Sequence, residues 1–335
     1  MKSCKIFLFI ILIVFSSCST QESKISIGFL ADTFEIARWQ KDRQYFVEKA
    51  EELGAKVIVK SANGDDVRQV KLAQELIDEG VKVLVVVATN SNSAAAIVRL
   101  AHKNNVKVIG YARLIKNCDL DYFITFDVEK IGSLQADYIK NIKPQGTYVL
   151  INGDKADINA QIEHSGVIKS LQTEIESGNI KLLYDAFIEG WSPENAEHLM
   201  KKIVEFGNEP IDAVIVGNDG MATGIYEALA EYGLSGEVLL TGLDAEPIAL
   251  KRILNGDQSM TVYMSIKKLA YANAELAVKI AKNQKINTDF KYTDNGRIKV
   301  PTIVLEPQVV DKNNIETTVI AENFVTMQDI EKSSY

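Results

Sequence analysis

The sequence predicts an α/β protein with two lobes, each built on a doubly wound parallel sheet. Three observations lead to this prediction. Short apolar runs alternate with helical segments from residue 25 onward, and the run 83–87 is apolar at every position, as in a strand covered on both faces. The alternation forms two series, one from about 25 to 130 and one from about 133 to 260. A repeated β-α order implies right-handed crossovers with helices on both faces of each sheet.

The expected strands are short. They cover 25–30, 56–60, 83–87, 107–110 and 122–126 in the first series, and 147–151, 182–187, 213–217, 238–242 and 260–263 in the second. Between them, apolar residues recur at helical spacing. The first such pattern ends at Gly54 and the next at Gly80, where glycine favours the end of a helix. A chain of 335 residues has room for two such domains.

The amino terminus has the pattern of an export signal. Lys2 and Lys5 precede an unbroken apolar run over 6–15, which is too short to span a bilayer as a helix. Small residues lead to Cys18, as at a bacterial lipoprotein processing site, where that cysteine would be acylated and become a membrane anchor. Residues 19–24 are polar and would form a short tether.

A plain cleavage site remains an alternative for this segment. Phe15 stands three positions before Cys18, where leucine is usual in lipoprotein signals. On that alternative the cysteine is incidental and the mature protein carries no anchor.

Composition and motifs exclude several classes of function. The net charge is −8 without a clustered basic face, which argues against a nucleic-acid partner. Three cysteines and three histidines occur without the spacing of a zinc site, and Cys118 is expected to be a packed thiol. The chain lacks the glycine-rich phosphate and dinucleotide motifs and the nucleophile elbow, so we expect a binding protein without metal or cofactor rather than an enzyme.

Polar and aromatic residues gather just after the expected strands, where ligands bind in parallel α/β sheets. Carboxylates, amides and cations suit the hydroxyls of a sugar, and an aromatic plate suits its C–H face. This mixture predicts a sugar site between the lobes. Its residues are Asp32, Arg38, Trp39, Lys41, Asn90, Arg113, the stretch 152–159, Trp191, Asn218, Asp219 and Asp244.

Three of these residues also have a plain structural interpretation. Trp39 lies on the apolar seam of a helix and would pack there. Trp191 lies in a Gly-Trp-Ser-Pro turn, and Asp219 would cap the helix that begins near Gly220.

The chain resembles bacterial periplasmic D-xylose-binding proteins over essentially all of residues 25–325. The resemblance rests on long collinear motifs at 38–43 (RWQKDR), 60–64 (KSANG), 189–196 (EGWSPENA), 217–219 (GND), 260–263 (MTVY) and 311–315 (DKNNI). It implies a type I periplasmic-binding fold with three crossover strands, and delivery of a sugar to an ATP-driven (ABC) permease by a monomeric protein. Together with the amino-terminal pattern, this gives the following expected division of the chain: signal 1–18, tether 19–24, first lobe 25–131 plus 263–299, second lobe 132–262 plus 300–330.

The resemblance also carries the family's sugar contacts onto this sequence. On the first lobe they are Arg38, Lys41 and Arg113. On the second lobe they are Asp157, Asn159, the stacking Trp191, Asn218 and Asp244.

Two positions depart from the family pattern. Ala112 stands where the family has an aspartate before the arginine, and Met264 stands where it has a lysine after the Thr-Val-Tyr strand. One negative and one positive group are lost together, so the formal charge of the site is unchanged. We expect xylose itself to bind less well, or a sugar with fewer hydroxyls or a bulkier apolar group to be preferred.

Three other functions are compatible with parts of this pattern. A sugar sensor that presents its ligand to a chemoreceptor or a histidine kinase would have the same fold. A sugar-responsive transcription regulator would need an amino-terminal helix-turn-helix in place of the export segment. An enzyme acting on sugars would need an acid/base pair, for which Asp157 and Asp219 are the candidates.

Overall fold

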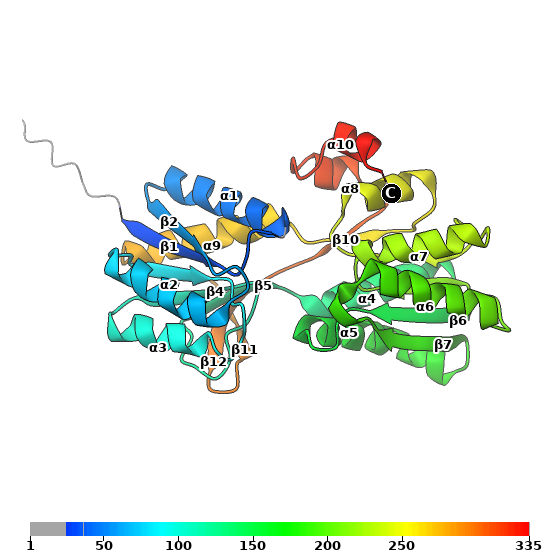
Figure 1. The fold of residues 1–335 in the computed structure, drawn as a ribbon, viewed down its shortest axis with the longest axis horizontal. Coiled ribbons are helices and arrows are strands. Elements are labelled where there is room, and N and C mark those ends of the chain that lie inside the picture. Colours follow the sequence, from blue (N-terminus) through cyan, green and yellow to red (C-terminus); the bar gives the residue numbers. More distant parts are fainter. Residues whose placement is uncertain (1–24, 36, 335) are drawn as a thin grey trace, which may run out of the picture.

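The computed structural model describes residues 25–35 and 37–334. The predicted signal, the tether and the acylated Cys18 therefore lie outside the described residues. In the part that is described, the chain forms two lobes side by side, joined by extended segments (Figure 1).

The first lobe is built on a seven-stranded sheet in the order β11-β12-β5-β4-β3-β1-β2, in which all strands are parallel except β11. Its strands are β1 (Ser26–Ala31), β2 (Lys56–Ser61), β3 (Val83–Val86), β4 (Lys107–Tyr111), β5 (Tyr122–Phe126), β11 (Lys291–Asp294) and β12 (Lys299–Leu305).

Helices cover both faces of this sheet. One face packs against α1 (Ala37–Glu52) and α9 (Ile266–Ala281), and the other against α2 (Asp66–Asp78) and α3 (Ala95–Lys103). Val83 and Val85 belong to the first core, whereas Leu84 and Val86 belong to the second. The continuous apolar run in β3 is thereby explained, because its side chains are buried on both faces.

The second lobe has a four-stranded parallel sheet in the order β7-β6-β8-β9. Its strands are β6 (Gly146–Asn152), β7 (Ile180–Phe187), β8 (Ala213–Val216) and β9 (Leu239–Leu240). One face is covered by α6 (Pro193–Phe206) and α7 (Asp219–Glu231), and the other by α4 (Val128–Ile142) and α5 (Ile158–Glu176). The short helix η1 (Glu189–Trp191) follows β7.

The carboxyl-terminal segment completes the second lobe. The strands β10 (Thr261–Tyr263) and β13 (Gln308–Val310) pair antiparallel, and α8 (Pro247–Asn255), the π-helix η2 (Glu316–Ile320) and α10 (Met327–Lys332) pack with them around one core.

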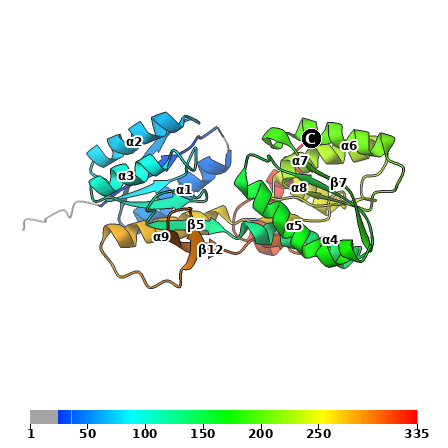
Figure 2. The ribbon, with the colours of Figure 1, turned by 90° about the horizontal axis from the view of Figure 1, so that it is seen from below.

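The chain passes between the lobes three times. The passages lie between β5 and α4, between β10 and α9, and between β12 and β13. Figure 2 shows β5 and β12, which pair in parallel, next to each other at the middle of the molecule.

Two of the predicted lobe boundaries are wrong. The boundary at 131/132 falls inside α4, which packs as a whole on α5 in the second lobe. The boundary at 299/300 falls inside β12, whose residues Thr302–Leu305 pair with β5 in the first lobe. A strand cannot be divided between two lobes while its ladder is intact, so the third passage comes after Leu305.

All ten expected strands are present, with ends that differ by a few residues, and β11, β12 and β13 are additional. Within the described ranges, no helix is both long enough and apolar enough to cross a bilayer.

The close packing of α4 on α5 gives a test of the second-lobe fold. A Cβ atom added at Gly166 would lie 2.0 Å from the backbone oxygen of Glu129, so Gly166→Ala forces the helices apart. We expect the free energy of unfolding to fall by about 1–3 kcal/mol, measured by urea denaturation. Gly220→Ala is the control, because its methyl group would meet no atom closer than 3.7 Å. Equal stability of the two variants would contradict this packing.

Candidate functional site

A cleft of about 770 Å³ lies between the lobes. Its walls come from the segments after β3, β4 and β5 of the first lobe, from β11 and β12, and from the segments after β6 and β7 of the second lobe. Of the predicted contacts, Arg113, Asp157, Asn159 and Trp191 line it, as does Ala112. Strand ends of both lobes thus lie around one gap at these residues.

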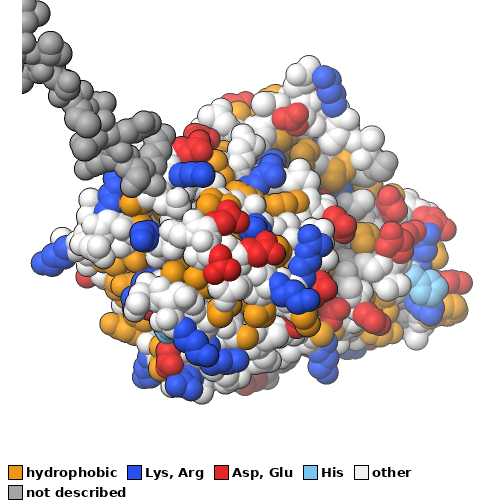
Figure 3. All heavy atoms as spheres, turned by 60° about the vertical axis from the view of Figure 1, so that its left-hand side comes forward, with side chains coloured by type: hydrophobic (Ala, Val, Ile, Leu, Met, Phe, Trp, Pro, Cys, Tyr) orange, Lys and Arg blue, Asp and Glu red, His pale blue; other side chains and the backbone are white. Residues whose placement is uncertain are grey.

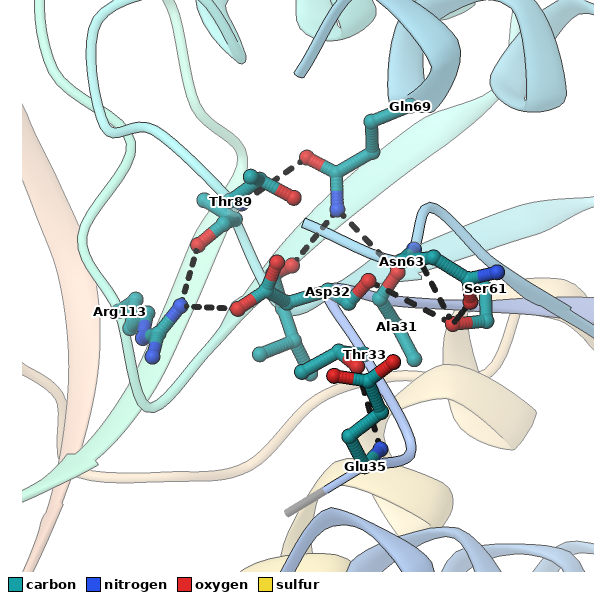
Figure 4. A network of polar contacts seen from close by, with 11 residues as sticks. Ala31, Asp32, Thr33, Glu35, Ser61, Asn63, Gln69, Thr89 and Arg113 are labelled. Atoms are coloured by element: carbon teal, nitrogen blue, oxygen red, sulfur yellow. Dashed lines mark hydrogen bonds and ion pairs between the residues drawn. The ribbon is translucent and has the colours of Figure 1, made fainter. Parts of the chain in front are cut away.

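Arg113 is held in a fixed position on the first-lobe wall. Its Nη1 atom donates to Asp32 Oδ2 at 2.8 Å and to the backbone oxygen of Ala88 at 3.1 Å (Figure 4). Its guanidinium carbon also lies 5.3 Å from the centre of the Trp39 ring. Three neighbours thus orient the guanidinium, and a planar cation with several N–H groups is suited to oxygen atoms of a ligand.

One carboxylate oxygen of Asp32 is available to accept a hydrogen bond. Asp32 is 7% exposed, and its Oδ1 atom has no hydrogen-bond partner among the described residues. Such an oxygen gains from a hydroxyl donor, because a buried acceptor without a partner costs free energy. Asp32 is not itself part of the cleft wall, but it lies directly behind Arg113, which is.

Ala112 adopts a conformation that alanine seldom takes. Its φ angle is +59°, and its backbone is tied to the sheet because its N–H donates to the oxygen of Ile124 and its own oxygen accepts from the Thr125 hydroxyl. Asparagine and aspartate adopt positive φ more readily than alanine does. The backbone at 112 is thus suited to the aspartate that the resemblance places there.

On the second lobe, polar groups lie where α5 begins. Asp157 caps the helix by accepting from the Asn159 N–H at 2.8 Å. Asp154 accepts from the N–H groups of Ala156 and Gly190, and so ties the loop after β6 to the turn that carries Trp191. Asp154, Asp157 and Asn159 all line the same cleft.

Trp191 lies over two glycines. A Cβ atom on Gly153 would be 2.2 Å from Cη2 of the indole, and one on Gly217 would be 3.1 Å from Cζ3. The indole can reach this position only because both residues after β6 and β8 lack side chains. Trp191 is partly exposed and lines the cleft, so its free face is available for stacking.

Arg38 lies beside the cleft rather than in its wall. Its Nε atom is 3.6 Å from Oδ2 of the fully buried Asp42, and its guanidinium carbon is 5.0 Å from the Trp39 ring. Burial raises the pKa of Asp42 to about 6, although Arg38 and a hydrogen bond from Tyr111 both favour its ionised form.

Asp244, on the second lobe, is influenced by the same arginine. Burial raises the pKa of Asp244, and the positive charge of Arg38 opposes that rise. The charge of Arg38 on the first lobe therefore favours the ionised form of Asp244 on the second. Trp39 itself is 5% exposed and packs edge-on against Tyr111, so the plain packing interpretation is confirmed for this residue.

The wall of the cleft does not include three of the residues singled out from the sequence, which are Lys41, Asn218 and Met264. The Lys41 amino group donates to the oxygen of Phe324 at 3.2 Å and lies over that ring. Asn218 caps α7, accepting from the Met221 N–H. Met264 lies at the second passage and packs against cores of both lobes.

Asp219 has a different role from the predicted helix cap, and that prediction is wrong. The cap is Asn218, whereas the Asp219 side chain is fully buried and accepts from Gln258, Thr261 and the Glu246 N–H. Burial raises its pKa to about 8. It joins α7 to the segments after β9 and before β10, and it is inaccessible as an acid/base group for a ligand.

Sequence reasoning missed part of the cleft. Lys291 and Thr293 contribute to its wall from β11, a strand whose residues are mostly exposed and whose sequence has no apolar alternation. Ile158 and Ile162 at the start of α5 also line it and are about 40% exposed. Two isoleucines one helical turn apart, directly after a strand-end loop, are the sequence feature that indicates an apolar surface at this wall of the cleft.

The charges on the surface are mixed. On the face in Figure 3, acidic and basic side chains alternate without a broad basic area. The described residues contain no group of three or more side chains arranged to hold a metal ion. The arrangement of the cleft, with cation, carboxylates, amide and indole around one gap, suits a small polyhydroxy ligand.

Comparison with known proteins gives a consistent assignment. Residues 27–285 match the family model described as "Periplasmic binding protein domain". The chain is 43% identical to the D-xylose-binding periplasmic protein of Haemophilus influenzae, covering 95% of this chain and 96% of that one. It is 41% identical to the D-xylose-binding periplasmic protein of Escherichia coli, with 93% and 94% coverage.

A solved structure shows the same fold. The solute-binding protein of Clostridium phytofermentans with bound β-D-glucose superposes with a TM-score of 0.79 at 27% identity, covering 91% of this chain and 99% of that one. The two-lobed α/β architecture and the sequence matches agree, and the chain belongs to the periplasmic binding protein family, where it is similar to D-xylose-binding members.

Proposed function

We propose that this protein is an exported sugar-binding protein that holds a monosaccharide, xylose or a related sugar, between its lobes and delivers it to an ABC permease. The observation that carries the proposal is the placement of Arg113 and Trp191 on opposite walls of one cleft. The resemblance to D-xylose-binding relatives along almost the whole chain supports it. Binding of this kind needs no covalent step.

The mechanism follows from the three passages between the lobes. Short extended connections allow a hinge motion, and a ligand that touches both lobes binds the closed form better and shifts the population toward it. Arg113 and Asp32 would hold hydroxyls from the first lobe, and Trp191 would stack on the sugar from the second. A permease then distinguishes the closed shape from the open one.

The remaining predicted contacts differ in how directly each could touch the sugar. Asp157 and Asn159 already line the cleft, whereas Arg38, Asn218 and Asp244 are outside its lining. These three would have to reach the sugar on closure. Lys41 would have to leave the oxygen of Phe324 to make such a contact. We therefore place it last among the candidates.

Ala112 and Met264 are proposed to set the preference among sugars. Ala112 lines the cleft with a methyl group, and Met264 presents a thioether at the passage where both lobes meet. Neither can replace a hydrogen bond to a sugar hydroxyl. A missing partner costs about 1–3 kcal/mol, and two would weaken xylose by roughly tenfold to ten-thousandfold.

Calorimetry against pentoses, hexoses and deoxysugars tests this proposal. We expect at least one sugar to bind more tightly than xylose, and Ala112→Asp combined with Met264→Lys to restore xylose binding. Ala112→Asp alone is the control, because it adds a carboxylate without the compensating cation. Submicromolar binding of xylose to the unaltered protein would refute the altered preference, and no binding of any sugar would refute the proposed function.

We further propose that Cys18 carries the lipid anchor. The apolar run that ends at Phe15 and the serines before the cysteine support processing at this position. Expressed in a bacterium with a fatty-acid label, the full chain is expected to incorporate label and to stay with the membrane. Cys18→Ser should abolish both while export continues. Label-free, soluble mature protein with an intact binding activity would favour the plain cleavage site.

A further inference from the structure

A second, much smaller cavity lies beneath the second-lobe wall of the cleft. It encloses about 10 Å³ and is lined by residues of α4, α5, β6 and β8, including Gln135 and Glu163, and by Gly153 and Gly217, which follow the two strands. This volume is close to the minimum for a single water molecule. A water at such a place needs two or more polar partners.

Two of the residues around this cavity carry oxygen atoms without a partner. Oε1 of Gln135 and Oε1 of Glu163 are both buried, and neither accepts a hydrogen bond from a donor among the described residues. The side chains belong to residues that are 0% and 5% exposed. Leaving buried acceptors unpaired is costly, so a donor that serves both would be favoured.

The orientation of the Gln135 amide is fixed by its other contacts. Nε2 donates to the backbone oxygen of Val216 at 2.9 Å and to that of Gly242 at 3.1 Å. Both partners are carbonyl oxygens, so the nitrogen must be on that side and the oxygen on the other. Gln135 thereby joins the last residue of β8 to the segment after β9, and each partner lies two positions before a predicted contact, Asn218 or Asp244.

The same glycines that line the small cavity also support the tryptophan. Gly153 and Gly217 lie between the cavity and the Trp191 indole, which contacts the positions that their Cβ atoms would occupy. The same two glycines therefore border both the small cavity and the indole.

We propose that the small cavity holds one water molecule that hydrogen-bonds to Glu163 and Gln135, and that this buried bridge fixes the floor on which Trp191 lies. Glu163 and Gln135 are then positioning residues for ligand binding, although neither touches the ligand. Burial, reinforced by the nearby charge of Asp244, holds the pKa of Glu163 well above its ordinary value, although the adjacent Gln135 side chain opposes that rise. A neutral acid fits a bridge of this kind, because it needs no cation beside it.

Trp191 offers a direct readout. The chain has only two tryptophans, so 5-fluorotryptophan labelling of the full protein gives two ¹⁹F resonances, which Trp191→Phe assigns. Glu163→Leu removes the hydrogen-bonding groups and should shift the Trp191 resonance without ligand. It should also weaken the best-binding sugar about tenfold. Glu163→Gln retains hydrogen bonding and should stay close to the unaltered protein in both measurements.

Leu171→Ala is the matched control, because Leu171 is fully buried in the same helix but in a core that does not include Trp191. It should lower stability and leave the Trp191 resonance in place. The proposal is overturned if Glu163→Leu behaves like Leu171→Ala.

A high-resolution crystal structure of the unaltered protein tests the water itself, and so covers the case in which Glu163→Leu does not fold. Density for a water within hydrogen-bonding distance of both oxygens supports the proposal, and a dry cavity contradicts it. Only the sugar-affinity measurement rests on the proposed function. The ¹⁹F and crystallographic measurements need no sugar, so failure of the bridge and failure of sugar binding are distinguishable.

Discussion

The chain crosses between its two lobes three times, and this constraint determines most of what the molecule can do. Each lobe is assembled from segments far apart in sequence, since β11 and β12 return to the first sheet after the second lobe is complete. The passages hold the lobes close together, and under the proposed function they are the hinge about which the lobes would close. Strand ends of both sheets therefore line one cleft, and it is the cleft, not either lobe, that has the composition of a binding site.

The two walls of the cleft differ in chemistry. The first lobe presents a guanidinium held by a carboxylate, a backbone oxygen and the Trp39 ring. The second presents an indole lying on two glycines, beside a helix start with its cap. A polyhydroxy ring with one apolar face can satisfy both walls together, whereas either wall alone offers only part of the interaction. This asymmetry is the physical reason that closure and binding would be linked.

Much of this could be predicted from the sequence, and what could not has identifiable causes. The run in β3 was recognised because both faces are buried, which makes every residue apolar. By contrast, β11 is an exposed edge strand without apolar alternation, and β13 has only three residues, so neither carries a periodic signal. The pairing of β12 with β5 depends on contacts across more than 170 positions in the chain, which no local pattern records.

The site residues, too, divide into those whose place the sequence predicts and those whose place it does not. Arg113 and Trp191 follow strands directly, so their location at the sheet edge follows from topology alone. Lys41 and Asp219 lie on helices, where the direction of a side chain depends on what packs beside it. Lys41 contacts Phe324 from the other end of the chain, and Asp219 joins three segments of its own lobe. Position after a strand predicts proximity to the cleft, but not which partner a long or buried side chain selects.

Small-angle X-ray scattering with and without sugar tests the central claim most directly. If one sugar is held between the lobes, saturating ligand lowers the radius of gyration of the protein, and Trp191→Ala, which removes the stacking plate, abolishes that change at the same sugar concentration. A sugar that binds the unaltered protein tightly and leaves the radius of gyration unchanged would contradict closure around a ligand as the basis of function.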